Sequence, residues 1–93
     1  MTRQKRIELY VDVLKTFGRG AQVMVLVEEC GELLSAIGKY LRERVTEEEV
    51  ITELADVAIM VEQMAILFGL PEFEAEKERK LMRLKRRIED ADT

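Results

Sequence analysis

Helical periodicity continues through almost the whole chain and limits the fold more than any other feature of the sequence. Between residues 3 and 17, apolar side chains recur at the three- and four-residue spacing of one helix face. The same spacing recurs over residues 21–42, 46–68 and 72–90. One Pro and five Gly in 93 residues leave few positions that oppose a helix. The sequence therefore predicts an all-α fold of four helices.

Three short interruptions separate the predicted helices. The GRG segment at 18–20 contains two Gly residues, which adopt turn conformations readily. Thr46 is expected to cap the third helix, because Glu49 follows at the position where a capping box requires Glu or Gln. Gly69 and Pro71 are expected to end that helix.

Residues 1–93 are expected to form a single domain, since no linker or low-complexity segment divides them. The loop between the second and third helices is short, so these two helices should pack as an antiparallel central pair. Both are apolar around much of their circumference, which is typical of helices buried on several sides. The two remaining helices cannot cover both, and we therefore expect a homo-oligomer.

The composition also limits where the protein acts. A single Cys cannot form an internal disulfide, which favours the cytoplasm. The charged first residues show no signal peptide, and no run approaches the roughly 18 apolar residues that a membrane span needs. The absence of His excludes catalysis by His-activated nucleophiles and zinc sites that need imidazole.

Two pairs of acids stand beside the apolar stripes of the central helices. Glu29 and Glu32 are three residues apart in the second helix, and Glu53 and Asp56 are three residues apart in the third. This spacing places both members of a pair on one helix face, about one turn apart. In an antiparallel pair the two sets fall at nearly the same height, so four carboxylates are expected to converge.

No basic residue of the central segments can neutralise these acids. All fifteen Lys and Arg lie within residues 3–19, 39–44 and 77–87, whereas residues 20–38 and 45–76 hold twelve Asp or Glu and no base. Buried carboxylates without partners are costly, so they must either become protonated or bind cations. Oxygen ligands without His or thiolate favour Mg²⁺, with Mn²⁺ as the alternative. The opposing interpretation is a solvated acidic face, which is the usual role of glutamates in so acidic a chain.

The acidic motifs resemble a known family. The segments "EECGE" at 28–32 and "ELAD" at 53–56 are similar to the E-E-x-x-E and E-x-x-D motifs of MazG-like nucleoside triphosphate pyrophosphohydrolases. The resemblance extends over about residues 18–90. It implies a four-helix MazG-like protomer within an oligomeric helical bundle, either a dimer or a tetramer, with the tetramer favoured. The metal ligands that it implies are Glu29, Glu32, Glu53 and Asp56.

The same resemblance implies an activity. Family members hydrolyse (d)NTPs to the monophosphate and pyrophosphate with Mg²⁺, often to clean the nucleotide pool. Glu28 or Glu32 is the candidate general base, because either carboxylate could accept a proton from water if it is not fully used as a ligand. Many members carry an Asn after the second motif, but this sequence contains no Asn. The preferred base and sugar are therefore open. The sequence also leaves open whether water attacks the α- or the β-phosphorus.

Candidate groups for binding the triphosphate lie on both sides of the acidic motifs. Seven basic residues fall between positions 77 and 87, and Lys77, Lys80 and Arg83 are the candidates for a phosphate clamp. Their alternative role is a solvated basic face. Gln22 stands two turns before Glu29 and could contact substrate, or simply cap the helix. The net acidity and the lack of interleaved aromatic residues argue against nucleic acid as a partner.

Two other function classes compete with the hydrolase. A non-catalytic helical module that binds nucleotide or protein would tolerate Glu→Gln changes in the acidic motifs. A di-iron carboxylate bundle normally uses Glu-x-x-His pairs, and the absence of His opposes it. A metal-dependent phosphate-release assay over several (d)NTPs distinguishes the hydrolase from the module.

Overall fold

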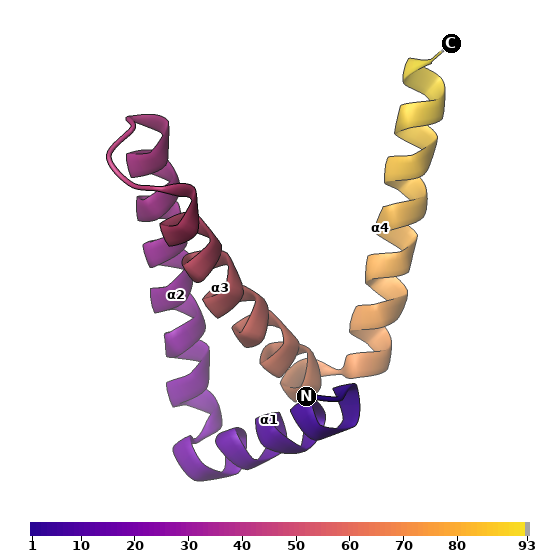
Figure 1. Ribbon diagram of the computed structural model, residues 1–93. Coiled ribbons are helices and arrows are strands. Elements are labelled where there is room, and N and C mark those ends of the chain that lie inside the picture. Colours follow the sequence, from indigo (N-terminus) through magenta and orange to yellow (C-terminus); the bar gives the residue numbers. More distant parts are fainter. Residues whose placement is uncertain (93) are drawn as a thin grey trace.

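The computed structural model describes residues 1–92, and these residues form four α-helices and no strand. The predicted all-α class is confirmed. Figure 1 shows the four helices in chain order. Their bounds are α1 Arg3–Phe17, α2 Arg19–Leu41, α3 Glu47–Phe68 and α4 Leu70–Ala91.

Local side-chain hydrogen bonds define where two of the helices begin. The Thr2 hydroxyl accepts a hydrogen bond from the Lys5 amide at the start of α1. At the start of α3, the Thr46 amide donates to the Glu49 carboxylate over 2.9 Å, and the Glu49 amide donates back to the Thr46 hydroxyl over 3.4 Å. This reciprocal pair is the predicted capping box.

The first interruption is shorter than the sequence suggested. Gly18 alone separates α1 from α2, and its φ of 91° lies in a region that side-chain-bearing residues rarely adopt. The helix α2 therefore begins at Arg19, two residues earlier than expected, and Gly20 lies inside it. One residue with positive φ is sufficient to reorient the chain, so the second Gly is not needed for the turn.

Gly69 ends α3 as expected, with a φ of 140°, but the expected role of Pro71 was wrong. Pro71 lies in the first turn of α4, which begins at Leu70 and not at residue 72. The first backbone amides of a helix have no intrahelical acceptor, so the missing N–H of Pro is tolerated there. Pro71 thus helps to start a helix after the turn.

The helices α2 and α3 make the most extensive contact in the described chain. Their ends are linked by two hydrogen bonds: Tyr40 Oη donates to Glu47 Oε1 over 3.1 Å, and Gln63 Nε2 donates to Gln22 Oε1 over 2.7 Å. The end of α2 thus lies beside the start of α3, and the bond between Gln22 and Gln63 joins the two helices again near their other ends.

The buried core is small and lies where α1 crosses the end of this helix pair. Its buried apolar side chains are Tyr10 from α1 and Met60, Met64 and Ala65 from α3. Tyr10 Oη donates a 2.7 Å hydrogen bond to Glu62, and burial together with this bond raises the pKa of Tyr10 to about 12. The described chain concentrates its packing at this end.

The last helix extends away from the rest of the molecule. Figure 1 shows α4 leaving the end of α3 and standing apart from α2. The apolar residues Leu81, Leu84 and Ile88 remain 51%, 52% and 61% exposed. The radius of gyration is 16.3 Å, whereas a compact domain of this length has about 12 Å. Within residues 1–92, no helix combines the length and apolar character required to cross a bilayer.

Candidate metal centre

Three carboxylates from α2 and α3 converge between these helices. Glu29, Glu53 and Asp56 each offer one oxygen, and the three oxygens lie within 4.8 Å of one another. We refer to these three residues as the acid cluster. Helical spacing places Glu53 and Asp56 one turn apart on α3, facing Glu29 on α2. A cation could be held by all three.

Two oxygens of the acid cluster are buried without a partner. Glu29 Oε2 and Glu53 Oε2 are inaccessible to solvent, and neither makes a hydrogen bond within the described residues. Leaving a buried acceptor unsatisfied costs free energy, and more so when the group is charged. No member of the acid cluster forms an ion pair in residues 1–92. These two oxygens therefore distinguish the cluster from a solvated acidic surface.

Desolvation and neighbouring negative charges both affect the pKa values in the acid cluster. Desolvation raises the pKa of Glu29 above its usual range, and the negative charges of Glu32, Asp56 and Glu53 raise it further. Desolvation also raises the pKa of Glu53, again with added repulsion from Glu32 and Asp56. The ionised forms of both groups are therefore disfavoured, and the positive charge of a bound divalent cation would stabilise them.

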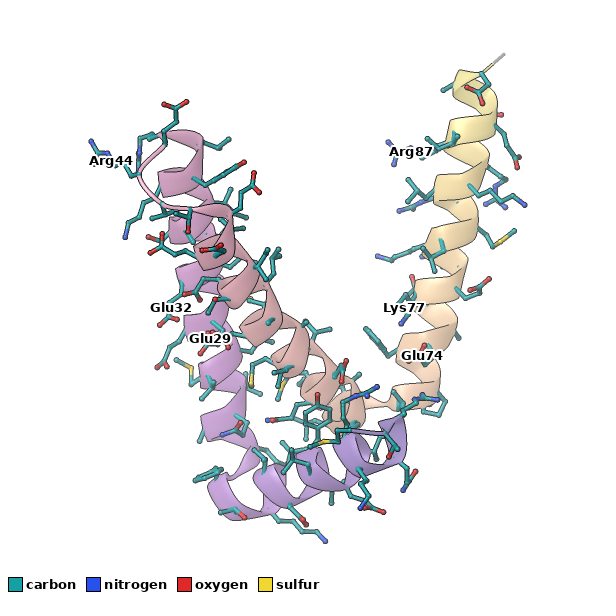
Figure 2. All side chains as sticks on the ribbon, viewed as in Figure 1. Glu29, Glu32, Arg44, Glu74, Lys77 and Arg87 are labelled. Atoms are coloured by element: carbon teal, nitrogen blue, oxygen red, sulfur yellow. The ribbon has the colours of Figure 1, made fainter. Side chains whose placement is uncertain are left out.

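The other two acids of the first motif have different positions. Glu32 lies one turn beyond Glu29 on α2 (Figure 2), and its charge acts on both Glu29 and Glu53. Its carboxylate is not among the three that converge, although the sequence placed it with the ligands. Glu28 is exposed and also lies outside the acid cluster. A one-residue step turns the helix by about 100°, so Glu28 and Glu29 face different ways.

Gln22 is packed into the core, although its spacing from Glu29 allowed an open position in contact with substrate. Its side chain is buried and accepts the hydrogen bond from Gln63 on α3. This pairing satisfies the Gln22 carbonyl inside the protein. In the single chain, Gln22 acts as a link between α2 and α3.

The three candidate phosphate-binding cations are not brought to the acid cluster within one chain. Lys77, Lys80 and Arg83 all lie on α4, and Figure 2 shows Lys77 on a different arm of the molecule from Glu29. Lys77 Nζ lies 3.4 Å from Glu74 and 5.3 Å from the centre of the Phe73 ring. Lys80 and Arg83 form no ion pair within the described residues.

A pocket of about 320 Å³ adjoins the acid cluster on the side of the α2–α3 loop. It shares Glu53 with the cluster and is also lined by Glu32 and Lys39. Lys39 was not singled out from the sequence, where it is one of three cations near the loop. The available signal was its position seven residues after Glu32, which returns to the same helix face after two turns.

Comparison with known proteins gives no significant match to a protein-family model, a curated protein or a solved structure. The geometry of this chain is therefore the basis for assigning its function. That geometry supplies a set of oxygen donors, two of them buried and unpartnered, beside a pocket lined by the Lys39 side chain. Such a set is suited to binding a divalent ion together with an anionic ligand.

Proposed function

We propose that this protein is a Mg²⁺-dependent nucleoside triphosphate pyrophosphohydrolase of the MazG-like kind. The observation that carries the proposal is the pair of buried, unpartnered oxygens on Glu29 and Glu53. Hard oxygen donors without His or thiolate fit Mg²⁺ best, with Mn²⁺ as a substitute. Glu29, Glu53 and Asp56 would hold the ion, and Glu32 would complete the set as a neighbouring ligand or base.

The proposed reaction cleaves the anhydride between the α- and β-phosphates. Water attacks phosphorus, the bridging P–O bond breaks, and nucleoside monophosphate and pyrophosphate leave. Bound Mg²⁺ would neutralise the triphosphate and make the attacking water more acidic. The proton of the water passes to a nearby carboxylate, for which Glu32 is better placed than Glu28, because the charge of Glu32 acts on both Glu29 and Glu53.

The working unit in this proposal is a homo-oligomer in the cytoplasm, with the α2–α3 antiparallel pair at its centre. The described chain exposes 7263 Å², whereas a compact monomer of 10.8 kDa exposes about 5,500 Å². The excess is as large as a standard protein interface. A tetramer would cover the exposed face of α4 and could bring Lys77, Lys80 and Arg83 of one chain toward the acid cluster of another.

A phosphate-release assay coupled to inorganic pyrophosphatase tests the activity over a panel of NTPs and dNTPs. We expect turnover with Mg²⁺ or Mn²⁺, none with EDTA, and none in Glu53→Gln. Nucleotide binding without turnover on any member of the panel would instead support the second candidate, a non-catalytic helical module. The exposed apolar face of α4 is the observation that favours that candidate.

A further inference from the structure

The pocket beside the acid cluster is built by one face of each central helix. Along α2, Glu32, Ser35 and Lys39 lie three and four residues apart, so their side chains follow one line on the helix surface. On α3, Thr52 and Glu53 form the facing wall. The pocket thus continues the line of the acid cluster toward the loop between the helices.

Lys39 is the cation that lines this pocket. Its side chain is exposed and forms no ion pair within residues 1–92, so its charge is available to a ligand. Ser35 makes no side-chain hydrogen bond in the same part of the chain and can donate one. The Thr52 hydroxyl is already donating to the Glu48 carbonyl and is less free to do so.

The distance along the helix indicates which part of a substrate would reach Lys39. Seven residues separate Lys39 from Glu32, which corresponds to about 10 Å of helix. When a phosphorus reacts at the acid cluster, the positive charge of Lys39 favours the more distant phosphates of the same chain on this side of the cluster over the uncharged nucleoside. With attack on the α-phosphorus, these phosphates become the leaving pyrophosphate, on which negative charge increases as the anhydride breaks.

We propose that Lys39, assisted by Ser35, binds the phosphates that leave as pyrophosphate, in the pocket between α2 and α3. This inference rests on the proposed function, and it adds a phosphate-binding residue supplied by the same chain as the acid cluster. Glu32, Glu49 and Glu53 also line the pocket and repel a free polyphosphate. Binding therefore requires the divalent ion, and Lys39 strengthens it.

Inorganic pyrophosphate is the probe, and isothermal titration calorimetry with and without Mg²⁺ is the measurement. We expect binding to the wild type only with Mg²⁺, and an affinity about tenfold weaker in Lys39→Ala, as for the loss of one charged hydrogen bond. Lys39→Arg should recover most of the affinity. Arg44→Ala is the matched control, because Arg44 projects outward at the same end of the helix pair (Figure 2) and does not line the pocket.

A structural role for Lys39 gives a different result. Lys39 lies in the last turn of α2, where a cation also stabilises the helix dipole. If that were its only role, Lys39→Ala would lower the melting temperature and leave pyrophosphate affinity unchanged.

Equal affinities in Lys39→Ala and Arg44→Ala, or no Mg²⁺-dependent binding by the wild type, would overturn the inference. A failure of the proposed hydrolysis would give a different result. Pyrophosphate binding would still depend on Lys39, but no nucleotide would be turned over.

Discussion

Glu29 and Glu53 differ from the surface glutamates of α3 and α4 because each buries one carboxylate oxygen that has no hydrogen-bond partner. Desolvation and the neighbouring acids raise the pKa of both groups. The folded protein without metal is therefore destabilised by their ionisation. At the scale of single residues, binding of the proposed ion would therefore be coupled to stability here.

Replacing either glutamate with glutamine should separate the effect on metal binding from the effect on stability. We expect Glu29→Gln and Glu53→Gln to lower Mg²⁺-dependent turnover by about 100-fold or more, because a ligand is lost. Without metal, each variant should melt no lower than the wild type, because an uncompensated charge is removed. Mg²⁺ should raise the melting temperature of the wild type but not of these two variants. Glu48→Gln, exposed in the first turn of α3, is the control, and full activity in a cluster variant would contradict the metal assignment.

The difference in metal-free stability between these variants and the wild type should depend on pH. A carboxyl whose pKa is higher in the folded state carries no ionisation penalty below the ordinary pKa of 4.5 and the full penalty above its folded pKa. The stability of the metal-free wild type should therefore fall as pH rises through that window. Thermal melts of wild type and Glu29→Gln should differ most above the folded pKa of Glu29 and converge toward pH 4.5. A difference that is constant with pH would show that the cause is not ionisation.

At the scale of helices, the junction between α3 and α4 depends on one residue. Gly69 has a φ of 140°, which only Gly adopts without strain, and a Cβ there would lie 2.5 Å from Glu72 Oε2. The Glu72 side chain can move, so the backbone angle is the greater obstacle. The direction in which α4 leaves the helix pair is therefore set by this single turn.

Gly69→Ala should destabilise the protein by about 1–3 kcal/mol, the usual cost of a strained backbone position. Gly20→Ala is the matched control, because Gly20 lies inside α2 with open space around it and should gain up to about 1 kcal/mol from higher helix propensity. Urea unfolding followed by circular dichroism measures both. Two changes of the same sign would contradict the role assigned to Gly69.

At the scale of the whole molecule, the described chain leaves a large apolar surface exposed. The face of α4 that carries Leu81, Leu84 and Ile88 has no partner in the described chain, and the chain is more extended than a compact domain of its length. Exposed apolar surface on this scale is typical of protein interfaces. Closed symmetric assembly of identical chains is the commonest way to cover it.

We expect light scattering at micromolar concentration to give a mass near four copies of the 10.8 kDa chain. Leu84→Glu should lower that mass, because it places a charge in the proposed interface, and it should lower turnover as well. Met82→Glu is the matched control, since Met82 lies about 160° around α4 from Leu84. A folded, active monomer would refute both the assembly and the sharing of a site between chains.

The amino-acid sequence by itself determined the class of fold and most helix ends. The capping box of Thr46 and Glu49 and the turn at Gly69 depend on contacts within a few residues, so local patterns predict them. It also determined which acids share a helix face, because each residue advances a helix by about 100°. The Gly18 turn and the place of Pro71 were missed by one or two residues, where turn and helix signals overlap.

Only the tertiary structure decided how those faces meet. It brought Glu29 together with Glu53 and Asp56, left Glu28 outside, paired Gln22 with Gln63 and set Lys39 beside the acids. It also held α4, with its candidate cations, away from the cluster. Helical spacing predicts the direction in which each side chain points from its own helix. How two helices lie relative to each other depends instead on how side chains from distant segments pack together. That packing buried the two unpartnered oxygens on which the proposed metal centre depends.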